Sequence, residues 1–210
     1  MKTLPEKFSV LAVSAAALAP VPALAHHVMG GKMPVTFMQG FLSGLGHPII
    51  GLDHFAALVG VGILAALIGR GLRPVIAFSA ALIVGVALHL ASADIPASEL
   101  LVGLSTILIG TLIAFRLPPG MLPAVVLFAV AGLVHGYALG ESIVGAESSP
   151  LSAYLAGLLA IQTIIGVAAY MITMKIQRRA PSFNRASMTA AGAVIALIGA
   201  VTIAAAGFPG

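Results

Sequence analysis

The sequence predicts an all-α membrane protein, a bundle of about six transmembrane helices behind an N-terminal signal peptide. Of its 210 residues, 60% are hydrophobic and 8% are charged, whereas a soluble domain carries about 25% charged residues. Apolar runs close to the length needed to cross a bilayer recur along the whole chain. Cysteine is absent, which excludes disulfides and thiolate metal ligands.

The N-terminal 25 residues have the three zones of a secretory signal peptide. Two lysines precede an apolar run, and small residues occupy the −3 and −1 positions of the segment Ala23-Leu24-Ala25. Cleavage after Ala25 would leave residues 26–210 as a single transmembrane domain that begins at His26. An uncleaved anchor, which would add a seventh span, is the alternative.

The first span of the mature chain is irregular, and the other five are continuous. Glycine and proline are concentrated in the first half of residues 35–69, so we expect a short outer helix that breaks into a full helix beginning near Pro48. The remaining apolar runs predict spans at about residues 74–92, 98–115, 121–140, 151–174 and 186–207.

The basic residues of the loops predict the orientation in the membrane. Lys and Arg fall in the connections after the first, third and fifth spans, whereas the intervening connections carry Asp94, Glu99 and Glu147. The basic connections are therefore expected in the cytoplasm and the mature N-terminus in the periplasm of a bacterial inner membrane. The net charge of +4 then reflects topology, and nucleic-acid binding is not expected.

With this topology, all six histidines fall on or toward the outer face. His47 and His54 flank the outer end of the first span, and His135 lies near the outer end of the fourth, with Asp53 and Glu141 at the same level. An Asp at mid-span costs about 2.5–3.5 kcal/mol on insertion scales, so such groups usually serve a ligand or a pathway. Imidazole and carboxylate without thiolate suit nickel, cobalt or zinc.

Two further histidines and the helix geometry refine this candidate metal site. The exposed pair His26 and His27 could concentrate metal at the entrance. His47 and His54 would lie about 10 Å apart along a continuous helix, whereas metal–nitrogen bonds are about 2 Å long. Either the intervening segment is distorted, or the two serve successive sites. Asp53 points about 100° away from His54, so one of them could bind the ion while the other orients a partner.

The fourth span carries a stripe of Gly132, Gly136 and Gly140 at four-residue spacing. Such a stripe lets another helix approach closely, and we expect the first span to dock there. This docking would bring His54 and His135 within reach of a common ion. Three polar residues inside spans are expected to bridge helices through hydrogen bonds: Thr106, Gln162 and Thr163.

Two motifs together resemble the HupE/UreJ family of nickel and cobalt permeases, which is associated with hydrogenase and urease gene clusters. The resemblance implies metal uptake into the cytoplasm and extends over the whole mature chain. Many members carry a further histidine where this chain has Leu139. The motifs are His47-Pro48-x-x-Gly51-x-Asp53-His54 and His135-Gly136-x-Ala138-x-Gly140-Glu141, and the resemblance assigns the metal to His47, Asp53, His54, His135 and Glu141.

The expected function is a secondary transporter or facilitator that imports a divalent ion, and not an enzyme. No nucleotide-binding motif occurs, and the loops are too short to hold an ATPase domain. A membrane metalloenzyme or a metal-binding accessory subunit is the alternative. The expected partners are the lipid bilayer and nickel, cobalt or zinc as substrate, with no prosthetic group. Homo-oligomerisation, a link to hydrogenase or urease maturation and the driving force stay open.

Overall fold

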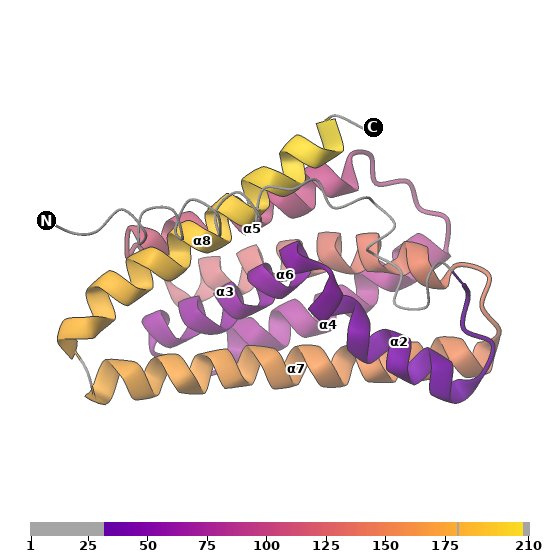
Figure 1. The fold of residues 1–210 in the computed structure, drawn as a ribbon, viewed down its shortest axis with the longest axis horizontal. Helices are drawn as coiled ribbons and strands as arrows, with labels where there is room; N and C mark the ends of the chain where they lie inside the picture. Colours follow the sequence, from indigo (N-terminus) through magenta and orange to yellow (C-terminus); the bar gives the residue numbers. More distant parts are fainter. Residues whose placement is uncertain (1–31, 180, 208–210) are drawn as a thin grey trace, which may run out of the picture.

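The computed structural model describes residues 32–179 and 181–207, and the predicted signal peptide, His26 and His27 lie outside them. The described chain is entirely helical, with no strand, as predicted (Figure 1). Its elements are α2 (Phe37–Ile50), α3 (Leu52–Ile68), α4 (Arg73–Leu90), α5 (Ser98–Ala114), α6 (Met121–Gly140), the 3-10 turn η2 (Glu141–Ile143), α7 (Ser148–Arg179) and α8 (Pro181–Gly207).

Most of the predicted spans are recovered as membrane-length helices. In the described chain, four helices are long and apolar enough to cross a bilayer, namely α4, α6 with η2, α7 and α8, and the bent pair α2–α3 counts as a fifth. Helix α5 is apolar but shorter, at 17 residues. Helix α7 continues beyond the expected end at residue 174, because Lys, Gln and Arg in its last turns are good helix formers.

The first span is broken as predicted, but at a different residue. Helices α2 and α3 meet at an angle of 78°, and the chain leaves the helical conformation at Gly51, with φ −72° and ψ 96°. Pro48 instead lies inside α2. A Cβ atom at Gly51 would lie 2.9 Å from Cδ2 of His54, so glycine at the break leaves room for that ring.

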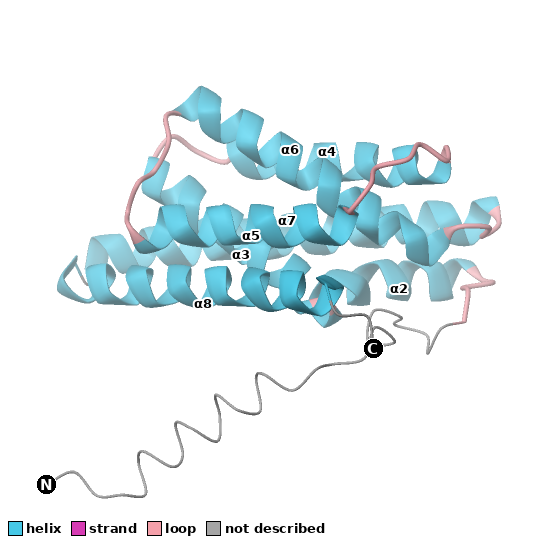
Figure 2. Cartoon of the chain, turned by 90° about the horizontal axis from the view of Figure 1, so that it is seen from above, coloured by secondary structure: helices cyan, strands magenta, loops and turns pink. Residues whose placement is uncertain are grey.

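Helix α3 is the centre of the bundle (Figures 1 and 2). It contacts every other α-helix of the described chain, and most of its residues are buried. The most extensive helix pairings around it are α4 with α6, α5 with α8, and α2 with α7. The histidine-bearing turn at the start of α3 is therefore enclosed by the surrounding helices.

The glycine stripe of α6 packs on α4, and the expectation that it receives the first span is wrong. A Cβ atom on Gly132 or Gly136 would collide with the backbone of α4 at Phe78 or Leu82. Gly85 of α4 in turn faces the backbone of α6. Glycines on both helices thus allow this close approach, and α3 contacts a different face of α6.

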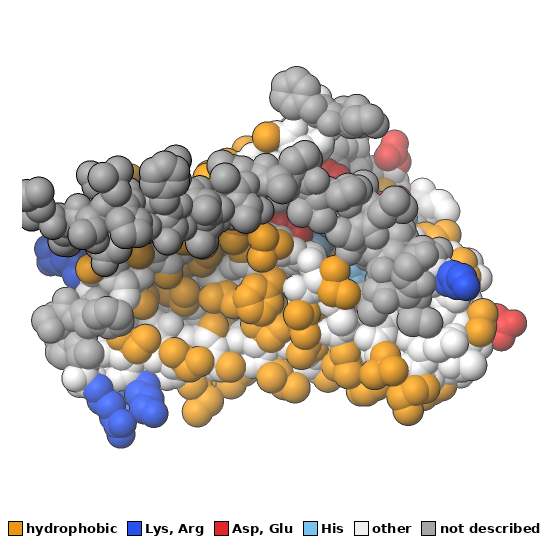
Figure 3. Space-filling model, viewed as in Figure 1, with side chains coloured by type: hydrophobic (Ala, Val, Ile, Leu, Met, Phe, Trp, Pro, Cys, Tyr) orange, Lys and Arg blue, Asp and Glu red, His pale blue; other side chains and the backbone are white. Residues whose placement is uncertain are grey.

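The surface of the bundle is apolar along its length and charged toward its ends. Figure 3 shows hydrophobic side chains across the visible face, with most of the visible Lys and Arg side chains at one end. Exposed Lys and Arg side chains lie at or near the α3–α4, α5–α6 and α7–α8 junctions. The carboxylates Asp94, Glu99 and Glu147 are exposed in or next to the connections at the opposite ends of the helices. This distribution suits a membrane-spanning body with one basic end.

Candidate metal-binding site

His54 of α3 and His135 of α6 meet inside the bundle. Their Nδ1 atoms lie 2.8 Å apart, and the rings pack edge to face with centroids 4.9 Å apart. The exposed fractions of the two residues are only 7% and 0%. The structure thus brings together the two histidines that were expected to reach a common ion, although they are 81 residues apart in the sequence.

Ser105 of α5 contacts the second ring nitrogen of His135. Its Oγ lies 2.9 Å from the carbonyl oxygen of Val102 and 3.0 Å from Nε2 of His135. A hydroxyl has one hydrogen and can give it to only one of these two acceptors. If the Val102 carbonyl takes it, Nε2–H of His135 donates to Ser105 and Nδ1 of His135 accepts from His54; if Nε2 takes it, Nδ1–H of His135 donates to His54. The resulting chain of hydrogen bonds connects α5, α6 and α3.

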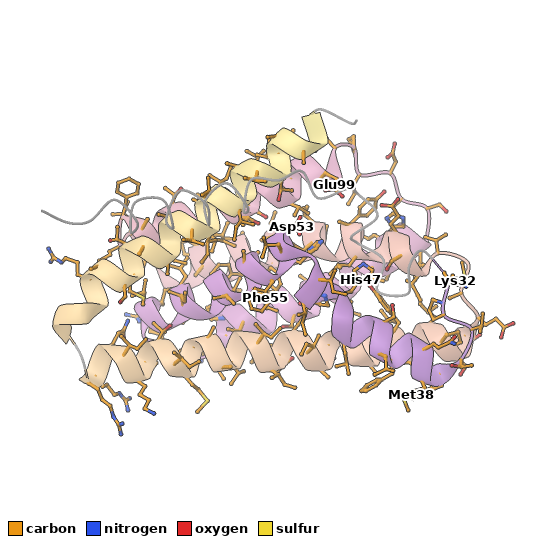
Figure 4. The ribbon with its side chains drawn as sticks, viewed as in Figure 1. Lys32, Met38, His47, Asp53, Phe55 and Glu99 are labelled. Carbon is orange, nitrogen blue, oxygen red and sulfur yellow. The ribbon has the colours of Figure 1, made fainter. Side chains whose placement is uncertain are left out.

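Asp53 precedes His54 in the first turn of α3, and both side chains are buried. The Oδ1 atom of Asp53 accepts the backbone N–H of His54 at 2.8 Å. A carboxylate in the first turn is stabilised by the positive end of the helix dipole. Figure 4 shows Asp53 beside the bend between α2 and α3. Asp53 thus fixes the backbone that carries His54 and places a negative charge close to the histidine pair.

A narrow internal cavity adjoins the pair and is too tight to admit a water molecule. Of its eight lining residues, three are polar: His54, His135 and Gln162 of α7. The others are apolar, and they include Leu139, whose side chain supplies no ligand at the cavity wall.

The remaining predicted ligands are more scattered. His47 of α2 is buried and packs edge to face against Tyr154, with ring centroids 6.1 Å apart (Figure 4). Glu141 follows α6 and is exposed. Across residues 32–179 and 181–207, no three His, Asp or Glu side chains are grouped so that they could hold an ion. The distortion at Gly51 therefore does not gather His47 into a three-ligand cluster with His54.

The polar residues inside the spans differ from the sequence prediction. Thr106 and Thr163 bond to carbonyls of their own helices, Val102 and Leu159, and do not bridge helices. Ser105, which sequence analysis missed, does form a bridge, to His135. Like Thr106, Ser105 is a hydroxyl residue inside an apolar run, and this pattern could have identified it. Spacing alone could not tell which of the two adjacent hydroxyls faces the histidine.

The geometry is suited to a borderline divalent ion. Two nitrogens bound to adjacent positions of one ion, with bonds of about 2.0–2.1 Å, would lie roughly 3 Å apart. The observed separation of 2.8 Å between the Nδ1 atoms is close to this value. Binding through both Nδ1 atoms would require each ring to carry its proton on Nε2, and the Ser105 hydroxyl lies where it can accept that proton from His135.

Comparison with known proteins places this arrangement in a family. Residues 13–202 match the family described as HupE / UreJ protein. The chain is 31% identical over 203 residues to Protein HupE of Rhizobium leguminosarum bv. viciae, an alignment that covers 94% of this chain and 98% of that protein. No solved structure matches the chain. The protein therefore belongs to the HupE/UreJ family.

Proposed function

We propose that this protein imports a divalent transition metal ion, nickel or cobalt, across the bacterial inner membrane. The observation that carries the proposal is the buried contact between Nδ1 of His54 and Nδ1 of His135, at 2.8 Å. Buried ionisable side chains in a membrane bundle are costly and are usually tied to a ligand or a pathway. Imidazole nitrogens favour nickel and cobalt over calcium or magnesium, which prefer oxygen ligands.

The distribution of charge supports entry from the end opposite the basic one. Exposed Lys and Arg lie at or near the α3–α4, α5–α6 and α7–α8 junctions, and the positive-inside rule puts these junctions in the cytoplasm. His54 is near the start of α3 and His135 near the end of α6, so both lie toward the periplasmic side. An ion from the periplasm would then reach the histidine pair before it crosses the greater part of the bundle.

Metal uptake into liposomes containing only this protein tests the proposal. Nickel and cobalt should enter faster than into empty liposomes, and each should compete with the other because both accept the same ligands. His54→Ala should abolish uptake. Thr163→Val is the matched control, since this exposed threonine bonds only to its own helix. Metal that binds to the protein without entering the liposomes would instead support an accessory subunit or a metalloenzyme.

A further inference from the structure

Gln162 is a buried polar side chain without a hydrogen bond in the described structure. Its exposed fraction is 1%, and neither Oε1 nor Nε2 of its amide has a partner among the described residues. Buried side-chain amides nearly always find hydrogen bonds, and an exception requires an explanation. The sequence suggested a helix-bridging hydrogen bond for this residue, which the described structure does not contain.

The position of Gln162 supplies the explanation. The residue lines the same cavity as His54 and His135, so α7 contributes a polar group where α3 and α6 contribute the two rings. The rest of the lining is Pro48, Leu58, Phe78, Leu82 and Leu139, whose side chains offer no hydrogen-bond donor or acceptor. Gln162 therefore lines a cavity whose other polar residues are the histidine pair and whose remaining lining is hydrocarbon.

We propose that Gln162 is a third ligand for the transported ion, which it binds through its amide oxygen beside His54 and His135. This inference rests on the proposed function and adds a residue to the same site. Amide carbonyls coordinate divalent metal ions, and nickel and cobalt accept mixed nitrogen and oxygen ligands. Since the amide oxygen is neutral, it binds the ion more weakly than a carboxylate would. Weaker binding favours release, which transport requires.

The proposal makes Gln162→Leu an informative variant. Leucine has a similar size and removes two unpaired polar atoms from an apolar cavity, so the variant should fold and resist heating at least as well as the wild type. It should also bind nickel or cobalt more weakly, by roughly 10- to 100-fold, the range found for loss of supporting groups at metal sites. A purely structural glutamine would leave metal affinity unchanged.

Gln162→Glu tests the identity of the atom involved. A carboxylate at this place should bind the ion more tightly than the wild type and release it more slowly, so affinity rises while the uptake rate falls. The measurements are calorimetric titration of the purified full-length protein in detergent with NiCl2 or CoCl2, the visible absorption of bound Co2+, and uptake into liposomes. Thr163→Val, the exposed neighbour on the same helix, should leave all three unchanged.

His54→Ala, measured in parallel, separates the proposal from the function on which it rests. If His54→Ala loses binding while Gln162→Leu binds within twofold of the wild type, the role of Gln162 is overturned and the histidine site stands. If His54→Ala binds and transports like the wild type, the proposed site fails and the role of Gln162 with it. Should Gln162→Leu misfold, Gln162→Glu decides, and an affinity equal to or below that of the wild type would overturn the proposal.

Discussion

Two neighbouring residues of α6 make opposite kinds of contact. Gly136 lies against the backbone of α4 at Leu82, where no side chain fits between the helices. His135 points to another face, toward His54 of α3 and Ser105 of α5. The first contact is close packing between two backbones, and the second is a chain of hydrogen bonds between three helices.

Within the motif His135-Gly136, one residue therefore serves helix packing and its neighbour serves the candidate metal site. Close backbone packing stabilises helix pairs in membranes because van der Waals contacts increase as small residues allow approach. Hydrogen bonds between side chains in membrane bundles contribute less, on average about 0.6 kcal/mol. The glycine contact should therefore determine whether the bundle forms, while the histidine contact should determine what the bundle does.

Gly136→Leu should have the largest effect, because its side chain would collide with the backbone at Leu82 and force α4 away from α6. We expect loss of folded, monodisperse protein in detergent, measured by size-exclusion chromatography and thermal unfolding. Val130→Leu is the control, since Val130 is an exposed residue of the same helix. A stable Gly136→Leu protein would show that the α4–α6 contact is not required for folding.

His135→Ala should abolish metal uptake but leave the bundle folded. The variant loses the hydrogen bonds of His135 to His54 and to Ser105, each worth about 0.5–1.5 kcal/mol, and one imidazole ligand. The expected result is a protein that elutes and unfolds much like the wild type but transports no nickel or cobalt into liposomes. Uptake at more than a few per cent of the wild-type rate would exclude His135 as an essential ligand.

Ser105→Ala should weaken metal binding by roughly 10- to 100-fold, as loss of a supporting hydrogen bond to a metal-binding histidine usually does. Without the hydroxyl, Nε2 of His135 loses its hydrogen-bond partner on α5, so the tautomer that binds metal through Nδ1 is no longer supported. Thr106→Val is the matched control, because this adjacent hydroxyl bonds only to the Val102 carbonyl. Equal affinities of the two variants would contradict a role for Ser105 in fixing the tautomer.

Acidification of the outer solution from pH 7 to pH 6 should have the smallest effect, a modest fall in uptake, because the histidine ligands must be neutral to bind metal. The sign follows because a protonated ring cannot bind metal. Initial uptake should be measured at fixed free metal, with the pH gradient collapsed by an ionophore. Stimulation by acid without a gradient would contradict histidine binding, and stimulation only with a gradient would indicate proton coupling.

The sequence predicts where the helices of this protein lie along the chain better than it predicts which helices pack against each other. A bilayer requires about 20 apolar residues for each span, so the runs that form α4, α6 and α8 are visible without a structure. A glycine stripe shows that some helix approaches closely, but not which one. Gly85 of α4, which faces α6 in return, was the available signal for the correct partner.

The contact between His54 and His135 was predicted, for a related reason. The prediction rested on shared depth in the membrane, which follows from position along each span, and on the glycine stripe, whose partner is in fact α4. Which other side chains face the histidine pair depends on the direction in which each points from its helix. That direction depends on how the helices are rotated against each other. Ser105 faces His135 while Thr106 does not, and Gln162 faces the cavity. None of these orientations follows from spacing within one helix.

The sequence separation of the histidine pair has a consequence for biosynthesis. At a synthesis rate of 5–20 residues per second, the 81 residues between His54 and His135 take roughly 4 to 16 s to make. During that interval Asp53 and His54 must enter the membrane before their partner from α6 exists. The uninterrupted apolar segment that follows them, from Phe55 to Ile68, provides the hydrophobicity that membrane insertion requires. Helix α3 can thus remain inserted in the bilayer until α6 is synthesised and supplies His135.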